Sequence, residues 1–264
     1  MKILLPPSEG KARPSSGPSL DLAALAWAEV APVSNLRSAL VEELEQVSAR
    51  SDALDVLGVG VKVADAVHDQ INLRELPCVP AWQLYTGVLY EAMDLATVMM
   101  DDGEAAARAR EAVLVFSGLF GVTRVSDLLP AYRLSMGTKL PSTGNTATAW
   151  KRALRGLPLA ENELVVDCRS GAYQVWNPPA DCDWVEIRAV REGGGKRTVV
   201  SHNAKHFRGL LAGELIRADH SPSDAEELAE FARVLVDRGH AQAIELSEPT
   251  AKGPRSLTIV TVQD

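Results

Sequence analysis

The sequence predicts a mixed α/β protein in which one compact domain, residues 1–264, holds a mixed sheet with flanking helices. Short apolar runs, typical of buried strands, alternate with longer segments whose apolar residues recur at helical spacing. Hydrophobic residues make up 46% of the 264 positions, which is enough for a large core. No fixed-period repeat or low-complexity linker divides the chain, so a single domain is the simplest organisation.

The first half of the chain predicts strands at both ends and helices between them. Lys2–Leu5 is an apolar run stopped by two prolines and favours a strand, and residues 11–19, rich in Pro, Ser and Gly, favour a loop. Ser34 is a candidate N-cap for an amphipathic helix, because apolar residues recur at helical spacing from Leu36 to Val47. Further on, we expect helices at 61–73 and 88–100 and a buried strand at 112–116.

The second half repeats this alternation. We expect a helix at 146–154, strands at 163–168, 184–190 and 197–201, helices at 204–218 and 223–238, and strands at 243–246 and 257–262. Ser223 and Glu226 have the spacing of a capping box at the start of the 223–238 helix. Residues 192–196 contain three glycines and favour a hairpin loop over a domain boundary.

The charge balance excludes a protein that coats nucleic acid over its whole surface. The chain has 27 Lys and Arg against 35 Asp and Glu, a net charge of −8. Two windows differ: residues 124–155 hold six basic residues and one acid, and residues 195–217 hold five and one. A globally acidic protein with a local cationic site is therefore expected.

Targeting signals and cysteine chemistry favour the cytoplasm. The apolar runs are far shorter than the roughly 20 residues that span a bilayer, and the N-terminal sequence does not resemble a signal peptide. Cys78, Cys168 and Cys182 are far apart in the sequence and form no metal or redox motif. We expect a cytoplasmic protein with plain thiols, no membrane association and no cofactor.

Two early segments carry polar residues at the ends of predicted elements. Glu9 and Lys11 follow the first strand, a position where ligands often bind in α/β folds. Tyr85-Thr86-Gly87 precedes a predicted helix whose free N–H groups could hold an anion. A polar turn and simple helix capping are the alternative explanations.

A third segment, residues 116–122, is the most informative. Gly118 and Gly121 flank two large apolar residues directly after the predicted buried strand, which suggests a tight hairpin that exposes backbone N–H groups. Together with Ser117 such a turn could cradle a phosphate, as helix-hairpin-helix elements do. Arg133 and Lys139, further along, would strengthen anion binding. Alternatively, the glycines serve only a sharp connection.

The fourth segment is residues 201–209. Lys205 and Arg208 lie three apart near the start of a predicted helix, where cations are unfavourable, so an anionic partner would explain them. His202 and His206 lie four apart but have no evident third ligand, so no metal site is predicted. Nucleophile-elbow, P-loop and dinucleotide motifs are absent from the sequence, and catalysis does not follow from motifs alone.

Residues 117–122, continuing through Asp127-Leu128 and residues 132–137, resemble the central signature of the YaaA family of peroxide stress proteins. Tyr85-Thr86-Gly87, residues 204–209 and residues 7–11 are similar to its shorter motifs. Two departures, Ala172 in place of a glutamate and His206-Phe207 in place of Lys-Ala, suggest a diverged, actinobacterial-type member.

The resemblance implies a cytoplasmic α/β protein with a cationic cleft and a helix-hairpin-helix-like element. It also implies DNA binding and protection from hydrogen peroxide and iron-driven DNA damage. The residues it brings to the cleft are Lys11, Tyr85, Ser117, Arg133, Lys139, Lys205 and Arg208.

Two functional hypotheses remain open. In the first, DNA or another phosphate-bearing ligand binds to Lys11, Ser117, Gly118, Gly121, Arg133, Lys139, Lys205 and Arg208. In the second, an enzyme acts on a nucleobase, nucleotide or other small anionic metabolite, with Glu9, Lys11, Tyr85, Ser117 and Lys205 as candidate catalytic residues. Convergence of these segments on a wide groove favours DNA, and convergence on a closed pocket favours a small ligand.

Overall fold

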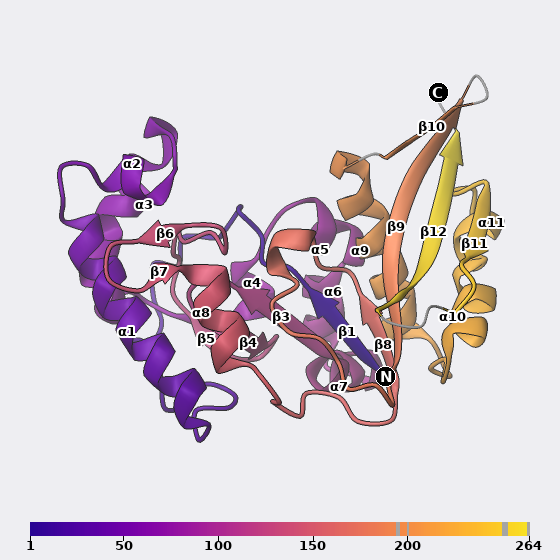
Figure 1. Cartoon of the computed structure of the whole chain (residues 1–264), viewed down its shortest axis with the longest axis horizontal. Helices are drawn as coiled ribbons and strands as arrows, with labels where there is room; N and C mark the ends of the chain where they lie inside the picture. The colour runs from indigo at the N-terminus through magenta and orange to yellow at the C-terminus, as the bar shows by residue number, and fades with distance from the viewer. Residues whose placement is uncertain (194–195, 200, 250–252, 263–264) are drawn as a thin grey trace.

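The computed structural model describes residues 1–193, 196–199, 201–249 and 253–262. Within them, eight strands form one sheet in the order β11-β12-β9-β8-β1-β3-β4, with β10 paired to β9 (Figure 1). The strands are β1 (Lys2–Leu5), β3 (Val113–Ser117), β4 (Gly121–Arg124), β8 (Leu164–Asp167), β9 (Asp183–Gly193), β10 (Lys196–Val199), β11 (Ala243–Leu246) and β12 (Arg255–Val262). Two small ladders pair β2 (Val79–Pro80) with β5 (Leu128–Leu129) and β6 (Lys139–Leu140) with β7 (Gly144–Asn145).

The centre of the sheet is parallel and its margins are antiparallel. Strands β3, β1, β8, β9 and β12 run parallel, whereas β4, β11 and β10 pair antiparallel with β3, β12 and β9. The parallel centre is covered on both faces, so Ile3, Leu4 and Leu5 of β1 are fully buried. The mixed α/β architecture expected from the sequence is confirmed.

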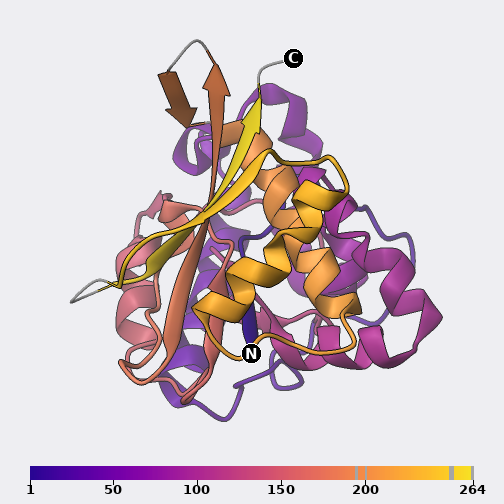
Figure 2. The same ribbon diagram turned by 90° about the vertical axis from the view of Figure 1, so that its right-hand side faces the viewer.

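Helices surround the sheet. They are α1 (Ala31–Ser48), α2 (Ala53–Leu57), α3 (Ala64–Asp69), α4 (Ala81–Leu84), α5 (Val88–Met93), α6 (Leu95–Asp101), α7 (Glu104–Ala112), α8 (Thr146–Ala153), α9 (Ser201–Arg217), α10 (Ala225–Ala232) and α11 (Val234–Asp237), with 3-10 turns η1 (Val61–Val63), η2 (Gln70–Glu75) and η3 (Gly171–Tyr173). Helices α7, α9 and α10 contact strands of the sheet, and Figure 2 shows α9, α10 and α11 to one side of strands β9 and β12. At the β4 end, α1 packs against η2 and α8. None of the described helices is both long enough and apolar enough to cross a membrane.

Helix α1 confirms the predicted amphipathic helix but begins earlier than expected. Its N-cap is Val30, and Pro32 occupies the first turn, where its fixed φ favours helix initiation. Ser34 is therefore not the N-cap, and its hydroxyl donates back to the carbonyls of Val30 and Ala31. A proline starts this helix where a serine cap was predicted.

Three predicted helices are broken. The 88–100 segment divides into α5 and α6 because Asp94 adopts a left-handed conformation with φ of 52°. The 61–73 segment forms η1, α3 and η2, with a kink at Asn72, and the 223–238 segment forms α10 and α11. Apolar periodicity indicated the buried face in each case, but it did not detect these interruptions.

Local boundaries shift in two further places. The capping box lies one residue later than predicted: Asp224 accepts from the Glu227 N–H, and the Glu227 carboxylate accepts from the Ser223 N–H and hydroxyl. Strand β10 ends at Val199 and α9 begins at Ser201, so the predicted 197–201 strand and 204–218 helix meet earlier than expected. Gly194 and Gly195 of the predicted hairpin loop lie outside the described residues, between the antiparallel strands β9 and β10.

Candidate functional site

Three segments that are distant in the sequence meet around Lys11. Lys11 forms an antiparallel bridge with Tyr85, the Ala12 N–H donates to the Leu84 carbonyl over 2.9 Å, and the Thr86 N–H donates to the Gly10 carbonyl over 3.1 Å. Backbone bonds thus fix the loop after β1 against the segment that leads into α5. We call the group formed by Glu9, Lys11, Tyr85, Tyr132 and Arg133 the Lys11 site.

The amine of Lys11 is half-buried and has no carboxylate partner among the described residues. It donates to the Ser8 carbonyl over 2.7 Å, and it lies 4.4 Å from the ring centroid of Tyr132 and 5.6 Å from that of Tyr85. Burial and the nearby Arg133 guanidinium lower the pKa of Lys11 to about 7, against a smaller opposing effect of Glu9. The contacts with the aromatic rings are favourable for the cation, but burial outweighs them.

Two buried tyrosines form the floor of the site. The hydroxyls of Tyr85 and Tyr132 lie 2.8 Å apart in a hydrogen bond. Burial raises the pKa of both phenols well above the ordinary value, while the adjacent Ser117 hydroxyl acts in the opposite direction. Both phenols are therefore neutral at physiological pH, which makes them hydrogen-bonding groups and not anions.

Arg133 closes the site on the third side. Its guanidinium donates to the Glu9 carbonyl, and its backbone N–H donates to the side-chain oxygen of Gln70. Lys11, Tyr132 and Arg133 line a cavity of about 80 Å³ together with Arg13, Pro14, Ala66, Asp69, Leu76, Pro77 and Ala131. This volume is well below the roughly 300 Å³ at which drug-sized pockets begin. It admits a small anion or a fragment of a larger one.

The 117–121 hairpin is present, but it is part of the core. It joins β3 to β4, residues 117–123 are buried, and a Cβ at Gly118 would lie 2.5 Å from the Leu134 carbonyl oxygen. The Gly118 carbonyl accepts from the Trp150 indole over 2.8 Å. The prediction that this turn exposes backbone N–H groups to a phosphate is wrong, and the turn links two strands where a helix-hairpin-helix element has helices. The glycines at 118 and 121 serve close packing, the alternative left open above.

A buried arginine holds the same hairpin from the other side. Arg37 of α1 donates to the carbonyls of Phe120 and Val122 and, over 2.7 Å, to that of Ala26. Ser117 is fully buried, and its hydroxyl accepts from the Phe120 N–H over 3.1 Å. Ser117 reaches the Lys11 site only through the two tyrosines, so it supports the floor of the site from within the core.

The other predicted cations lie elsewhere. Lys139 is exposed on β6, and Lys205 is exposed in the first turns of α9, while the Arg208 guanidinium donates to the Ile187 carbonyl of β9 over 2.9 Å. Figure 1 shows β6 beside α1 and α2 at one end of the molecule, and α9 beside α5 and β9. Among the described residues, no hydrogen bond or ion pair joins these three side chains to the Lys11 site.

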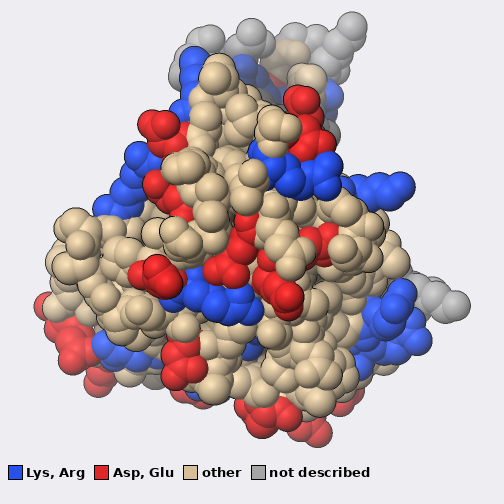
Figure 3. Space-filling model, turned by 90° about the vertical axis from the view of Figure 1, so that its left-hand side faces the viewer, with Lys and Arg blue, Asp and Glu red and all other residues tan. Residues whose placement is uncertain are grey.

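The face formed around α1 carries both charge signs. Figure 3 shows small groups of Lys and Arg side chains separated by Asp and Glu side chains on this face. Helix α1 and the loop after it take part in ion pairs, Arg74 with Glu45 at 2.5 Å and Arg50 with Asp52 at 2.7 Å. Mixed charge of this kind favours a local anion site over a broad basic track.

The histidines and cysteines singled out in the sequence lie apart from the Lys11 site or outside the described side chains. The His202 side chain lies outside the described residues, and no group of three metal-binding side chains occurs among the residues that the structure describes. The three cysteines are free. Burial raises the pKa of Cys168 to about 12 and that of Cys78 to about 11, so neither is a thiolate at neutral pH.

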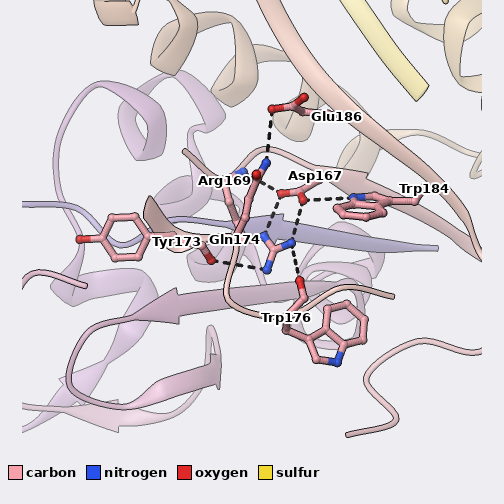
Figure 4. A network of polar contacts seen from close by, with 7 residues as sticks. All are labelled: Asp167, Arg169, Tyr173, Gln174, Trp176, Trp184 and Glu186. Carbon is pink, nitrogen blue, oxygen red and sulfur yellow. Dashed lines mark hydrogen bonds and ion pairs between the residues drawn. The ribbon is translucent and has the colours of Figure 1, made fainter. Parts of the chain in front are cut away.

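Sequence reasoning missed a buried ion pair beside the site (Figure 4). Asp167 and Arg169 are both fully buried, with Nε to Oδ1 at 2.9 Å and Nη2 to Oδ2 at 2.7 Å. The Trp184 indole donates to Asp167 over 3.1 Å, and Arg169 donates to the Trp176 carbonyl over 2.9 Å. The Arg169 guanidinium also lies 4.4 Å from the ring centroid of Phe116 in β3. An Asp and an Arg two residues apart at a strand end share one face of the extended chain, a signal that could have revealed the pair.

This pair positions Tyr173. Arg169 donates to the Tyr173 carbonyl over 3.5 Å, and the Tyr173 side chain interacts with Ser135 and the Met136 N–H. Burial raises the pKa of Tyr173, and the charge of Glu9 adds to that shift. Tyr173 is therefore a neighbour of the Lys11 site held by the Asp167–Arg169 pair. Ala172, which stands where the family resemblance implies a glutamate, is exposed beside it.

The sequence of this chain is similar to a known protein family and to bacterial proteins of similar length. Residues 1–234 match the sequence model of a family described as peroxide stress protein YaaA. A UPF0246 protein of Corynebacterium efficiens is 36% identical over 94% of this chain and 96% of its own length. A UPF0246 protein of Streptomyces coelicolor is 36% identical over 98% of this chain and 97% of its own.

More distant relatives extend the comparison beyond actinobacteria. An uncharacterized protein of Campylobacter jejuni is 29% identical over 80% of this chain and 82% of its own length. The family match covers the Lys11 site, the 117–121 hairpin and the Asp167–Arg169 pair. The chain therefore belongs to the YaaA family of peroxide stress proteins.

Proposed function

We propose that this protein takes part in the peroxide stress response by binding a phosphate-bearing ligand, DNA or a smaller molecule, at the Lys11 site, and that it thereby limits iron-driven DNA damage. One observation carries the proposal: Lys11 and Arg133, from separate segments, border the same cavity, and neither has a carboxylate partner among the described residues. A half-buried cation without a partner is unfavourable, so an anion in this cavity would stabilise the charge of Arg133 and the protonated form of Lys11.

The chemistry of the two side chains suits a phosphate. Arg133 uses one guanidinium nitrogen for the Glu9 carbonyl and keeps others for two oxygens of an anion. Lys11 adds a point charge, which an incoming anion would stabilise in its protonated form. Asp69, the carboxylate in the cavity wall, is already 3.3 Å from Arg13.

Exposed cations outside the site would contribute if the ligand is DNA. Lys139 and Lys205 are exposed and form no ion pair among the described residues. Each would add a phosphate contact on a strand that passes beyond the cavity. Their separation predicts few contacts and so a shallow salt dependence.

The DNA form of the proposal is tested by fluorescence anisotropy with duplex, gapped and single-stranded DNA at low and physiological salt. We expect saturable binding that Arg133→Gln weakens and that Lys139→Gln and Lys205→Gln weaken less. Lys151→Gln, an exposed lysine of α8 outside the site, is the matched control and should bind as the parent protein does. Equal affinity in Arg133→Gln and Lys151→Gln would refute the assignment of the site.

The cellular role needs a separate measurement. In a bacterium that lacks its own family member, expression of the parent protein should restore survival of hydrogen peroxide. Arg133→Gln at equal abundance should restore less. Full rescue by Arg133→Gln would show that survival of hydrogen peroxide does not depend on the Lys11 site.

The small cavity and the lowered pKa of Lys11 favour a second candidate, an enzyme acting on a nucleobase, nucleotide or other small anionic metabolite. A half-deprotonated amine beside a cation is suited to act as a base or nucleophile. A thermal-shift screen of nucleobases, nucleotides and phosphorylated metabolites tests it. Stabilisation of the parent protein and not of Arg133→Gln would support this candidate, and a null panel together with intact DNA binding would remove it.

A further inference from the structure

The Lys11 amine is incompletely hydrogen-bonded. A protonated lysine has three N–H donors, and among the described residues Lys11 has one acceptor at hydrogen-bonding distance, the Ser8 carbonyl at 2.7 Å. The aromatic rings of Tyr132 and Tyr85 occupy two further sides. A neutral amine, which needs fewer acceptors and has a free lone pair, fits these surroundings better than an ammonium does.

The neighbouring charge acts in the same direction. Arg133 lies close enough to disfavour a second positive charge, and burial with Arg133 lowers the pKa of Lys11 to about 7. About half of the Lys11 side chains are then nucleophilic at pH 7, whereas an ordinary lysine with a pKa near 10.4 is neutral in fewer than about one molecule in a thousand. A lysine desolvated beside another cation is a recognised form of activated nucleophile.

The cavity wall supplies anchors for an anionic group. Arg13 and Arg133 border the same cavity as Lys11; Asp69, 3.3 Å from Arg13, is the carboxylate in its wall, and Ala66, Leu76 and Pro77 add apolar surface. A carboxylate or phosphate held by the arginines would leave its attached carbon atoms near the amine. The volume of about 80 Å³ limits the enclosed part to a few heavy atoms.

We propose that Lys11 is a nucleophile that condenses with small anionic aldehydes or ketones to form an imine, with Arg13 and Arg133 holding the anionic group. The lone pair of Nζ attacks the carbonyl carbon and a C–N bond forms. Both amine protons end on the former carbonyl oxygen, which leaves as water, and a C=N bond replaces the C=O bond with no change in oxidation state. This assignment rests on the proposed anion-binding function of the Lys11 site.

The test uses glyoxylate as the anionic aldehyde and glycolaldehyde as its uncharged counterpart of similar size. The full-length protein is incubated with each at pH 7 and with cyanoborohydride, and peptide mass spectrometry measures the rate of labelling at every lysine. We expect glyoxylate to label Lys11 at least about tenfold faster than the exposed Lys139 and Lys205. The preference should fall severalfold with glycolaldehyde.

Two further arms fix the roles of the anchors. Arg133→Gln should slow glyoxylate labelling of Lys11 more than glycolaldehyde labelling, and inorganic phosphate should slow glyoxylate labelling in the parent protein. Lys11→Arg verifies the peptide assignment, and thermal denaturation verifies that each variant is folded. The selectivity among lysines is measured in the parent protein, so it does not depend on any variant.

The outcomes separate this inference from the function on which it rests. Labelling of Lys11 no faster than that of Lys139, with phosphate still stabilising the protein, would overturn the nucleophile and leave anion binding intact. Fast labelling of Lys11 that neither phosphate nor Arg133→Gln alters would overturn the anion site and, with it, the anionic substrate class.

Discussion

Two turns that both contain glycine have opposite roles in this molecule. The 117–121 hairpin is filled by its neighbours: a Cβ at Gly121 would lie 2.4 Å from the Trp150 ring. The turn at residues 8–11 lies at the surface, where Glu9 is exposed and Lys11 is half-buried. Spacing of glycines does not reveal whether backbone N–H groups face solvent or the core, and only the packed neighbours decide it.

The largest effect should come from removing a support that both regions share. Arg169 lies against Phe116 of the hairpin strand and holds the loop of Tyr173 beside the Lys11 site. Arg169→Met leaves the Asp167 carboxylate buried without its cation and should reduce the free energy of unfolding by about 3–5 kcal/mol. Urea denaturation measures it.

Arg188→Met is the matched control for this variant. Its partner is Glu186 at 2.6 Å, and the Arg188 side chain is 55% exposed, so the loss should be below about 1 kcal/mol. Similar losses in Arg188→Met and Arg169→Met would contradict the importance of burial for the Asp167–Arg169 pair.

A second test asks whether the hairpin is as tightly filled as its contacts indicate. Gly121 and Gly144 have φ of 66° and 77°, but a Cβ at Gly144 would meet nothing within 4 Å. Gly144→Ala should cost about 1 kcal/mol for the left-handed backbone alone. Gly121→Ala adds overlap with Trp150 and should cost about 3 kcal/mol in total. Equal losses of unfolding free energy in the two variants would mean that the Trp150 ring moves aside without a measurable cost.

A third test measures how the free energy of unfolding depends on pH, through the proton of Lys11. The lowered pKa of Lys11 means that the unfolded chain binds the proton more tightly between pH 7 and pH 10.5. The free energy of unfolding should therefore rise with pH across this window, by up to about 1.4 kcal/mol for each pH unit. Lys11→Met should lack that part of the slope when both proteins are denatured in urea at several pH values. If the slope of the free energy of unfolding against pH were the same in both proteins, the lowered pKa of Lys11 would be contradicted.

The smallest effect concerns the floor of the site. Tyr132→Phe removes the hydroxyl that lies 2.8 Å from the Tyr85 hydroxyl and should cost about 1 kcal/mol. Ser117 remains beside Tyr85 as a partner, which limits the loss. A loss above that of Gly121→Ala would show that the tyrosine pair, and not the hairpin, is the more tightly determined region.

The sequence predicted the sheet better than the helices. Strands such as Lys2–Leu5 and Ala243–Leu246 were predicted within their observed bounds because short apolar runs between turn residues have few other solutions. Helix ends and breaks depended on single residues, such as Asp94 in a left-handed conformation, which apolar periodicity does not detect.

The site was predicted in part. Glu9, Lys11, Tyr85 and Arg133 do converge, because the loop after β1 pairs with the segment before α5. The roles of Gly118 and Gly121 were wrong because burial is decided by Trp150 and Leu134, which are distant in the sequence. Likewise, no local pattern shows that the Lys11 amine lies beside the rings of Tyr85 and Tyr132 and near Arg133.

Strand β12 covers one long edge of strand β9. Its eight residues pair in parallel with residues 185–192 of β9, and β11 covers its other side. The family match ends at residue 234, before both strands. A chain cut there would leave a long edge of unpaired N–H and C=O groups on β9, the kind of edge that recruits strands from other molecules and starts aggregation. Strand β12 covers this edge of β9, and the sheet then ends at β11, a strand of four residues.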